Sequence, residues 1–199
     1  MPGARITSGE RVTLRTVEEE DVPFVQRALA NPELRYPMGN PVMNRDEVSK
    51  LHEDGSADRF LVYVNGENRE NGEDGENREN GEDGKNRRGG EADEVRRIGQ
   101  VNVMDADYKR PEIGYWLVPA VQGNGYGKES VSLVLDYVFR KYDTPAVGAE
   151  AYDFNEASRG LLESLGFVEE GRRRQYMFVD GEHRDMVQYG LLREEWRDR

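Results

Sequence analysis

Residues 111–127 read PEIGYWLVPAVQGNGYG, and this stretch decides the fold. Its first eight residues form an apolar run, which predicts a buried strand rather than one at a solvated edge. A glycine-rich turn follows at residues 122–127, and residues 125–142 then carry an apolar stripe typical of a helix, formed by Val131, Val134, Leu135 and Val138. A strand, a glycine turn and a helix in this order predict an anion site. The glycines free the backbone N–H groups, and the helix N-terminus adds its positive dipole end.

The spacing of the glycines narrows the choice of phosphate ligand. A P-loop requires GxxxxGK[ST], whereas here Gly127-Lys128 is followed by Glu129. A dinucleotide fingerprint requires GxGxxG after the first strand of a βαβ unit, whereas here the third glycine falls one residue early, after a late strand. Neither nucleotide motif fits. A strand-to-helix turn that binds nothing is the alternative, although three alternating glycines exceed what a turn needs.

Outward from this stretch, the chain alternates strands and helices. The expected strands lie at residues 11–17, 59–64, 95–104 and 146–151, with a final hairpin over 172–192 that turns at Asp180-Gly181 in type I′ geometry. The other expected helices lie at 18–30, 44–53 (capped by Asn44 and Glu47) and 155–165 (capped by Asn155). This order predicts a mixed sheet with helices packed on it, an α+β or three-layer α/β fold. Tyr176 and Phe178 share one face of the penultimate strand, and we expect them in the core.

One segment differs in composition from the rest. Residues 66–74 read GENRENGED, and residues 75–83 repeat these letters without change. Ala92 is the only hydrophobic residue between positions 65 and 94, so the segment cannot bury enough apolar area to offset the entropy of ordering it. We therefore expect a single domain over residues 1–199, with a disordered repeat insertion at 65–94 in a loop between two strands. A calcium-binding acidic repeat is the alternative.

Composition restricts the classes of function. The formal net charge of −12 disfavours a nucleic-acid partner, which would require a basic face. This acidity fits either of two interpretations. It could give a well-solvated surface suited to high salt, or an electrostatic field that attracts cationic substrates. No apolar run approaches the roughly 20 residues that span a bilayer, and residues 1–10 lack the apolar segment of a secretory signal, so no membrane partner is expected.

The side chains that could hold metals or act as nucleophiles are few. The chain has no cysteine, which removes thiolate metal ligands and a cysteine nucleophile and fits a reducing cytoplasm. Its two histidines, His52 and His183, are too few for a histidine metal cluster. We therefore expect a cytoplasmic protein with no metal site.

Several motifs together resemble one enzyme family. EIGYWLVPAVQGNGYGKES resembles the acetyl-CoA-binding region of the GNAT N-acetyltransferases, whose motif [QR]-x-x-G-x-[GA] is matched by Gln122, Gly125 and Gly127. The match extends through GERVTLR, NEASRGLLESLGF and VDGEHRDMVQYGLL, which resemble the branch that acetylates ribosomal-protein N-termini (RimJ/RimL-like). The resemblance covers nearly all of the chain apart from the repeat. It implies a three-layer α/β/α fold with a mostly antiparallel sheet, splayed central strands, and acetyl-CoA as cosubstrate.

The resemblance also implies roles for individual residues. The pantetheine arm of acetyl-CoA would pair with the strand end at Trp116, Leu117 and Val118, and its pyrophosphate would lie on Gln122, Gly123, Asn124, Gly125, Tyr126 and Gly127. Asn155 would contact the cofactor arm and Ser158 would lie near the thiol, although both also fit ordinary capping and first-turn positions. Many GNAT enzymes carry a tyrosine late in this helix that protonates the thiolate. Here Leu161, Leu162 and Glu163 stand at those positions, which leaves Ser158, water or no group for that step.

The chemistry of transfer requires only one base. An α-amine has a pKa of about 8, so the base removes a single proton as nitrogen attacks the thioester. Glu112, just before the apolar run, is the candidate; a surface acid beside Arg110 is the plainer interpretation. With no cysteine, direct transfer in a ternary complex is expected.

The acceptor and the assembly state stay open at this level. A protein N-terminal α-amine is the expected acceptor, for instance that of a ribosomal protein. A polyamine, an amino acid or an aminoglycoside is the alternative within the same fold. A non-catalytic acyl-CoA-binding module and a tethering protein built on the repeat are alternatives from other classes. Either a monomer or a homodimer is compatible with the sequence.

Overall fold

The structure is a computed structural model that describes residues 2–53, 55–65, 96–106 and 110–198. The predicted disordered insertion therefore lies outside the described residues, except for Asn65 at its start. The prediction of disorder there stays a prediction.

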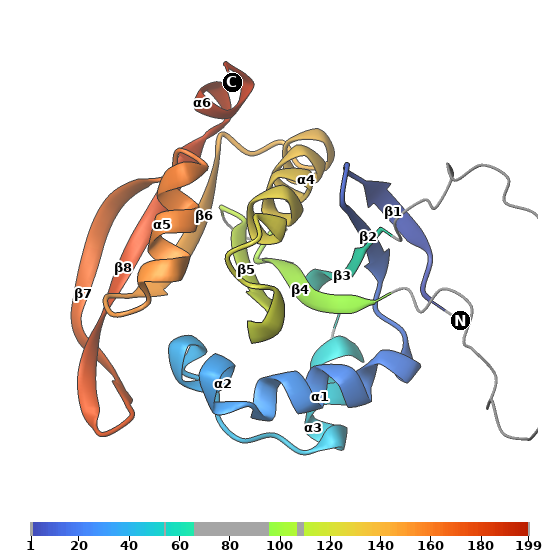
Figure 1. Ribbon diagram of the computed structural model, residues 1–199. Coiled ribbons are helices and arrows are strands. Elements are labelled where there is room, and N and C mark those ends of the chain that lie inside the picture. Colours follow the sequence, from blue (N-terminus) through green and yellow to red (C-terminus); the bar gives the residue numbers. More distant parts are fainter. Residues whose placement is uncertain (1, 54, 66–95, 107–109, 199) are drawn as a thin grey trace, which may run out of the picture.

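An eight-stranded sheet forms the centre of the molecule (Figure 1). Its strands are β1 (Arg5–Ser8), β2 (Val12–Thr16), β3 (Ala57–Val64), β4 (Arg97–Met104), β5 (Glu112–Leu117), β6 (Ala146–Tyr152), β7 (Val168–Val179) and β8 (Glu182–Leu192). They lie in the order β1-β2-β3-β4-β5-β6-β8-β7. All neighbours are antiparallel except β5 and β6, which are parallel, so the prediction of a mixed and mostly antiparallel sheet is confirmed.

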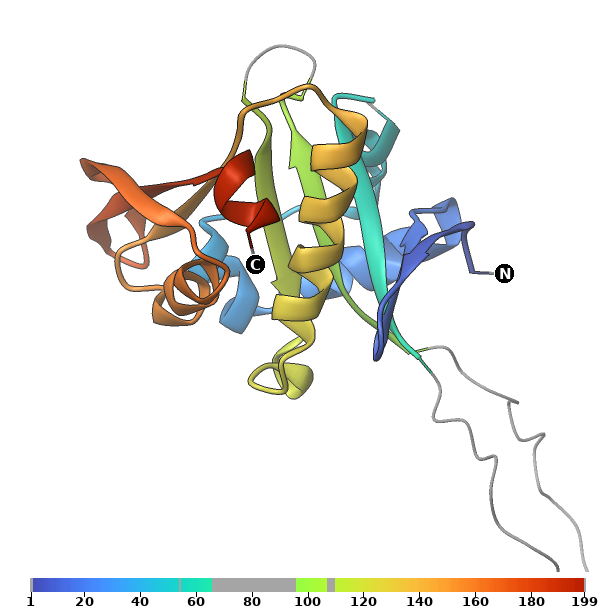
Figure 2. The ribbon, with the colours of Figure 1, turned by 90° about the horizontal axis from the view of Figure 1, so that it is seen from above.

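Helices cover both faces of this sheet. Helices α1 (Val22–Ala30), α2 (Pro32–Met38) and α3 (Arg45–Glu53) lie on one face, and α4 (Tyr126–Lys141) and α5 (Glu156–Ser164) lie on the other. Figure 2 shows α4 running along the strands in front of the sheet, with α1 behind it. Two turns of 3-10 helix, Glu19–Asp21 and Pro119–Val121, and the short α6 (Arg193–Arg197) complete the structure. The three-layer α/β/α architecture is confirmed.

Strand β5 separates two hydrophobic cores. Ile113 joins the core beneath α4 and α5, and Tyr115 packs against that same core. Trp116, only 4% exposed, points the other way into the core beneath α1, α2 and α3. Because both faces of the strand are covered, its residues read as a continuous apolar run rather than as an alternating one.

The parallel strands β5 and β6 diverge soon after they meet. They pair only where Glu112 lies opposite Gly148 and Ile113 lies opposite Ala149. On its other side, β5 pairs with β4 along its whole length. The sheet therefore opens between β5 and β6 toward the glycine turn, as expected for splayed central strands.

Most local capping and turn predictions are confirmed. Asn44 and Glu47 form a reciprocal capping box at the start of α3, with hydrogen bonds of 3.0 and 2.7 Å. Asp180 and Gly181 have φ angles of 50° and 84°, as a type I′ turn requires.

Three elements are present that the sequence pattern did not indicate, namely β1, α2 and α6. Helix α2 starts where we expected the chain to leave helical structure. Asn31 caps it by accepting a hydrogen bond from the Glu33 N–H, and Pro32 occupies the first helical position, where its missing N–H costs nothing.

The prediction for Tyr176 and Phe178 is wrong. They are 48% and 63% exposed, because β7 is the outermost strand of the sheet.

Candidate active site

The glycine turn at residues 122–127 joins the end of β5 to the start of α4. Gly123 and Gly125 have φ angles of 77° and 81°, a region that favours glycine. Gly125 is the N-cap residue of α4, and no side chain caps this helix. The N–H groups of the first helical turn thus lack a capping acceptor, which makes the turn suitable for a phosphate.

Side chains within the turn hold its shape. The Gln122 amide donates a hydrogen bond of 2.8 Å to the carbonyl oxygen of Leu117, and the Asn124 amide donates to that of Val121 at 3.1 Å. A Cβ atom on Gly127 would lie 2.7 Å from the Leu161 side chain, so glycine there permits close packing of α4 against α5. The structure brings all six predicted turn residues together, with backbone groups rather than side chains offered to a ligand.

The end of β5 lies between this turn and the opening in the sheet. The Trp116 side chain packs against Phe24, with 5.8 Å between ring centres, in the core beneath α1. Leu117 and Val118 are partly buried and pack against the cores. The side chains at this end of the strand thus pack into the protein, and the pairing of its backbone with the pantetheine arm stays a prediction.

Helix α5 begins on the far side of the opening. The side-chain oxygen Oδ1 of Asn155 accepts a hydrogen bond of 3.1 Å from the Ser158 N–H, which confirms the predicted cap. Its amide nitrogen donates to the Pro37 carbonyl oxygen at 3.2 Å and so ties α5 to the end of α2. Asn155 thus holds two elements at the edge of the opening.

Tyr115 is a residue of the site that the sequence analysis did not assign. Its hydroxyl oxygen lies 2.8 Å from Ser158 Oγ and donates to the Ser158 carbonyl oxygen at 3.1 Å. Burial raises the pKa of Tyr115 well above its ordinary value, so the phenol stays protonated and remains a donor at neutral pH. A signal was available in the alternation of β5, because Trp116 on one face puts Tyr115 on the other.

Glu112 lies at the other end of β5, away from the glycine turn. Its Cγ atom is 3.3 Å from the position that a Cβ atom on Gly148 would take, and Arg110 lies beside the same position. Because side chains alternate along a strand, Glu112 faces the side of the sheet opposite to Tyr115. The two candidate catalytic residues, Glu112 and Ser158, therefore lie on opposite faces of the sheet.

Charged side chains surround Glu112 on its face of the sheet. Arg110 forms a two-pronged ion pair with Glu170, at 2.6 and 3.0 Å, and Arg173 pairs with Glu150 at 2.9 Å. We call these five residues the polar face. It lies on the side of the sheet opposite to α5.

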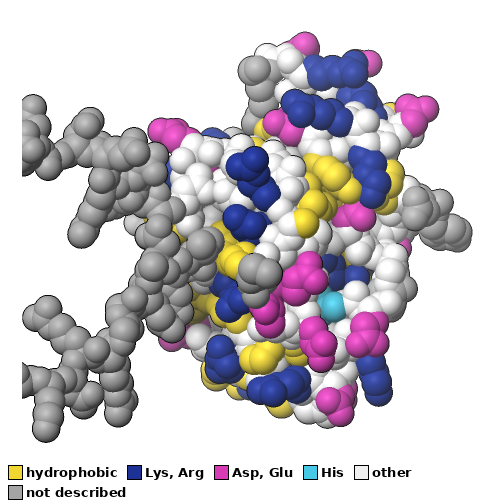
Figure 3. Space-filling model, turned by 90° about the vertical axis from the view of Figure 1, so that its right-hand side faces the viewer, with side chains coloured by type: hydrophobic (Ala, Val, Ile, Leu, Met, Phe, Trp, Pro, Cys, Tyr) yellow, Lys and Arg dark blue, Asp and Glu magenta, His cyan; other side chains and the backbone are white. Residues whose placement is uncertain are grey.

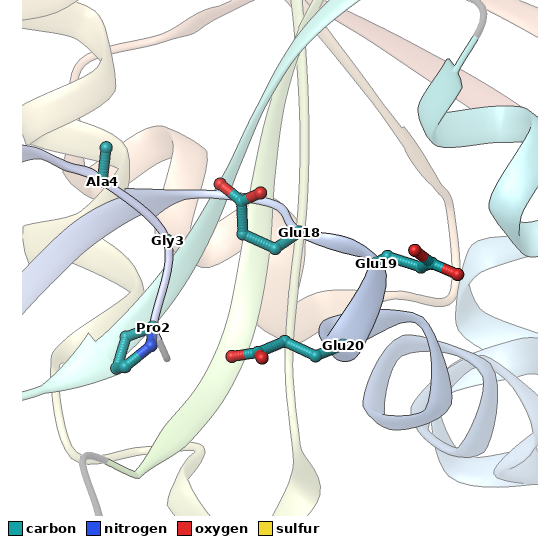
Figure 4. Close-up of a pocket in the computed structure, with 6 residues that line it drawn as sticks. All are labelled: Pro2, Gly3, Ala4, Glu18, Glu19 and Glu20. Atoms are coloured by element: carbon teal, nitrogen blue, oxygen red, sulfur yellow. The ribbon is translucent and has the colours of Figure 1, made fainter.

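Two other surface regions carry no such arrangement. Acidic and basic side chains are interspersed over the face of the molecule in Figure 3, which offers no continuous basic surface. A hollow of about 600 Å³ near the N-terminus is lined by Pro2, Gly3, Ala4, Glu18, Glu19 and Glu20 (Figure 4). Two of its three acids have structural partners, since Glu18 accepts from the Thr16 hydroxyl at 2.6 Å and Glu20 lies 3.8 Å from Arg97.

Neither a metal-binding cluster nor a membrane-spanning helix is found in the part of the chain that the structure describes. Within it, no group of three or more acidic, histidine or cysteine side chains is arranged to hold a metal ion. None of the helices there has the length and apolar character needed to cross a membrane.

A sheet that opens between two parallel strands, beside an uncapped glycine turn at a helix N-terminus, is the architecture of acetyl-CoA-dependent N-acetyltransferases. The sequence matches the Acetyltransferase (GNAT) domain family over residues 11–168. The chain therefore belongs to the GNAT acetyltransferase family, and the resemblance found in its motifs is confirmed.

Individual relatives differ in their acceptors. The chain is 36% identical over 93 residues to the putative ribosomal N-acetyltransferase YdaF of Bacillus subtilis, an alignment that covers 47% of this chain and 51% of that protein. The chain thus spans about half the length of this curated relative.

Solved structures agree on the fold over almost the whole chain. Spermidine N-acetyltransferase from Vibrio cholerae, in complex with CoA and spermine, has a TM-score of 0.75 at 20% identity and covers 95% of this chain and 99% of its own. RimL, a ribosomal L7/L12 alpha-N-protein acetyltransferase, has a TM-score of 0.70 at 19% identity. The alignment covers 95% of this chain and 94% of RimL. At these identities the likeness shows the fold alone.

Proposed function

We propose that this protein transfers an acetyl group from acetyl-CoA to the α-amine of a protein N-terminus, of the kind that ribosomal proteins present. The observation that carries the proposal is the uncapped glycine turn at the start of α4, which faces the opening between β5 and β6. A cytoplasmic location agrees with a chain that contains no cysteine.

The described residues fit acetyl-CoA, which supplies the activated thioester when bound. The N–H groups of residues 123–127 would hold the pyrophosphate at the positive end of α4. The backbone of Trp116, Leu117 and Val118 would pair with the amide groups of the pantetheine arm, because this end of β5 lies beyond its pairing with β6. Asn155 would contact the arm by exchanging its hydrogen bond to Pro37.

Glu112 is the proposed base. An α-amine needs to lose one proton as its nitrogen attacks, and a carboxylate on the polar face can take that proton directly or through a water. A backbone N–H of β5 would donate to the oxyanion that forms on the thioester carbon. Holding the amine and the thioester together supplies much of the remaining rate enhancement.

Ser158 is the proposed donor of a proton to the departing thiolate. Its hydroxyl lies at the start of α5, on the face of the sheet opposite to Glu112. An amine that arrives over the polar face and a thiol that leaves toward α5 would place the base and the acid on the two sides of the reacting carbon. This division matches a direct transfer without an acyl-enzyme.

The charge balance of the polar face supports a protein N-terminus over a polyamine. Glu150 is paired with Arg173 and Glu170 is paired with Arg110, so their charges are already matched. A polyamine carries several positive charges, and its binding requires several carboxylates whose charge is not already balanced. An N-terminus carries a single positive charge and requires fewer. A small amine such as a polyamine is the second candidate, because the fold is like that of a spermidine N-acetyltransferase.

A panel of acceptors tests the proposal. Purified protein is mixed with acetyl-CoA and either N-terminal peptides or polyamines, amino acids and aminoglycosides, and the release of thiol is followed. We expect release with peptides that is lost in Glu112→Gln and kept in Glu194→Gln, a matched change on the exposed α6.

Each other outcome has a definite meaning. Release with polyamines alone would show that the acceptor class is wrong. Binding of acetyl-CoA without transfer to any acceptor would indicate a non-catalytic acyl-CoA-binding module. Absence of acetyl-CoA binding would contradict the assignment of the glycine turn.

A further inference from the structure

The Arg11 side chain reaches the glycine turn from the opposite end of the sequence. It stands directly before β2, and its guanidinium donates a hydrogen bond of 2.9 Å to the carbonyl oxygen of Asn124. A Cβ atom on Gly125 would lie 3.0 Å from the same guanidinium, whose central carbon is 5.2 Å from the ring centre of Tyr126. Arg11 thus contacts three successive residues of the turn.

Glu129, in the first turn of α4, holds Arg11 in this place. One carboxylate oxygen accepts from the backbone N–H of Arg11 at 2.7 Å and from that of Val12 at 3.2 Å. The other accepts from Arg11 Nε at 3.0 Å. The Glu129 side chain is only 16% exposed and that of Arg11 is 47% exposed, so the carboxylate is shielded from solvent while the guanidinium is about half exposed.

The charge of Glu129 would otherwise oppose the function of the turn. A carboxylate in the first turn of a helix lowers the positive potential at that helix end, where an anion would bind. The guanidinium of Arg11 cancels this charge at a distance of 3.0 Å. The backbone N–H groups of the turn thereby keep their attraction for a second anion.

We infer that Arg11 is a positioning residue for the pyrophosphate of acetyl-CoA, acting through the backbone of the turn and through Glu129. The inference rests on the proposed function, because it takes the turn to be the pyrophosphate site. The roles proposed for Glu112 and Ser158 in the transfer step do not change. Arg11 is therefore expected to affect the binding of the donor and not the transfer step.

A truncated donor separates this role from a general effect on the fold. Acetyl-pantetheine carries the same thioester as acetyl-CoA but lacks the pyrophosphate and the adenosine. In Arg11→Gln we expect the KM for acetyl-CoA to rise about tenfold, with kcat unchanged and with the KM for acetyl-pantetheine unchanged. Arg11→Lys should reverse only part of the rise in KM for acetyl-CoA, because an ammonium group lacks the planar set of N–H donors that a guanidinium has. Arg5→Gln, on the exposed strand β1, is the matched control.

Charge cancellation is tested by a second variant that does not depend on the folding of the first. Glu129→Gln keeps the acceptor oxygen but removes the charge, and we expect it to bind CoA more tightly than the wild type. The double variant restores the wild-type net charge beside the turn, so its KM for acetyl-CoA should lie closer to the wild-type value than that of Arg11→Gln alone.

Three results would overturn the inference. They are an equal loss with both donors, an unchanged KM for acetyl-CoA in Arg11→Gln, and weaker CoA binding in Glu129→Gln. A wild-type protein that fails to bind CoA would overturn the proposed function itself, and this is seen before any variant is compared.

Discussion

The hydroxyl oxygen of Tyr115 lies 2.8 Å from Ser158 Oγ, and this contact joins β5 to α5 beside the opening in the sheet. Tyr115 has a single hydroxyl proton and two acceptors within reach, the Oγ and carbonyl oxygens of Ser158. When that proton is donated to Oγ, the proton of Ser158 is free to point elsewhere. The contact therefore controls the direction in which Ser158 can donate.

We predict that Tyr115→Phe lowers kcat by about tenfold and that the effect depends on Ser158. Because burial raises the pKa of Tyr115, the phenol is protonated across the neutral range, and the loss should not vary with pH there. Steady-state rates of Tyr115→Phe, Ser158→Ala and the double variant form a mutant cycle. An equal loss from Tyr115→Phe in both backgrounds would show that the tyrosine does not act through Ser158.

Asp58 predicts a pH dependence of stability. It accepts hydrogen bonds from the hydroxyls of Tyr142 and Tyr137 at 2.6 and 2.8 Å and from Lys141 Nζ at 2.9 Å. Burial alone would raise the pKa of Asp58, but the hydrogen bonds from these three groups together lower it. A carboxyl whose pKa is lower in the folded state stabilises the fold above its unfolded pKa, and this stability is lost as pH falls through the folded pKa.

We therefore expect Asp58→Asn to lower the free energy of unfolding by about 1–3 kcal/mol at neutral pH, and by progressively less in acid. Urea denaturation of both proteins at neutral and at acidic pH measures the difference. Asp46→Asn, on the exposed side of α3, controls for the loss of one charge. A difference that grows as the pH falls would refute the assignment.

Gly160 lies inside α5, where glycine is unfavourable. Apart from its chain neighbours and the backbone of its own helix, no atom of the described residues lies within 4 Å of the position that a Cβ atom would take there. Gly160→Ala should thus raise the free energy of unfolding of the ligand-free protein by about 1 kcal/mol. We also expect it to weaken CoA binding, because the open space lies on the helix that borders the proposed site. A stabilised variant with unchanged CoA affinity would show that Gly160 does not lie beside the bound ligand.

The repeat should be dispensable for the fold. Val64 donates a backbone hydrogen bond of 3.1 Å to Arg96, and Tyr63 lies opposite Arg97, so the two ends of the segment are already adjacent. Replacing residues 66–95 with Asn-Gly should form a tight hairpin that keeps the melting temperature and the transferase activity. Loss of activity in a protein that melts normally would show that the segment takes part in function.

Local rules explain which parts of the fold could be predicted. The cap at Asn155 and the turn at Asp180-Gly181 depend on the φ angles and side chains of a few neighbouring residues. The strand, glycine turn and α4 likewise follow from periodicity within a short window. Asn31-Pro32 carried a helix-start signal as well, but it also fitted the end of the preceding helix, and so α2 was missed.

The missed parts of the site depend on contacts between distant residues. Tyr115 and Ser158 are 43 positions apart, and Arg11 and Asn124 are 113 apart. No periodicity or motif links such pairs, because the topology of the sheet brings them together. Glu112 and Ser158 were predicted individually, but their placement on opposite faces of the sheet became apparent only with the register of β5.

The two-residue seam between β5 and β6 divides the sheet into two plates, β1 to β5 and β6 to β8. Beyond that seam, packing against the helices must hold the plates together, since the facing edges exchange no ladder hydrogen bonds. An elongated ligand that forms hydrogen bonds with both edges would act as a ninth strand and join the two parts into one continuous sheet. The donor would then be a structural component of the protein as well as its reagent, and loading it should slow amide exchange along both edges at once.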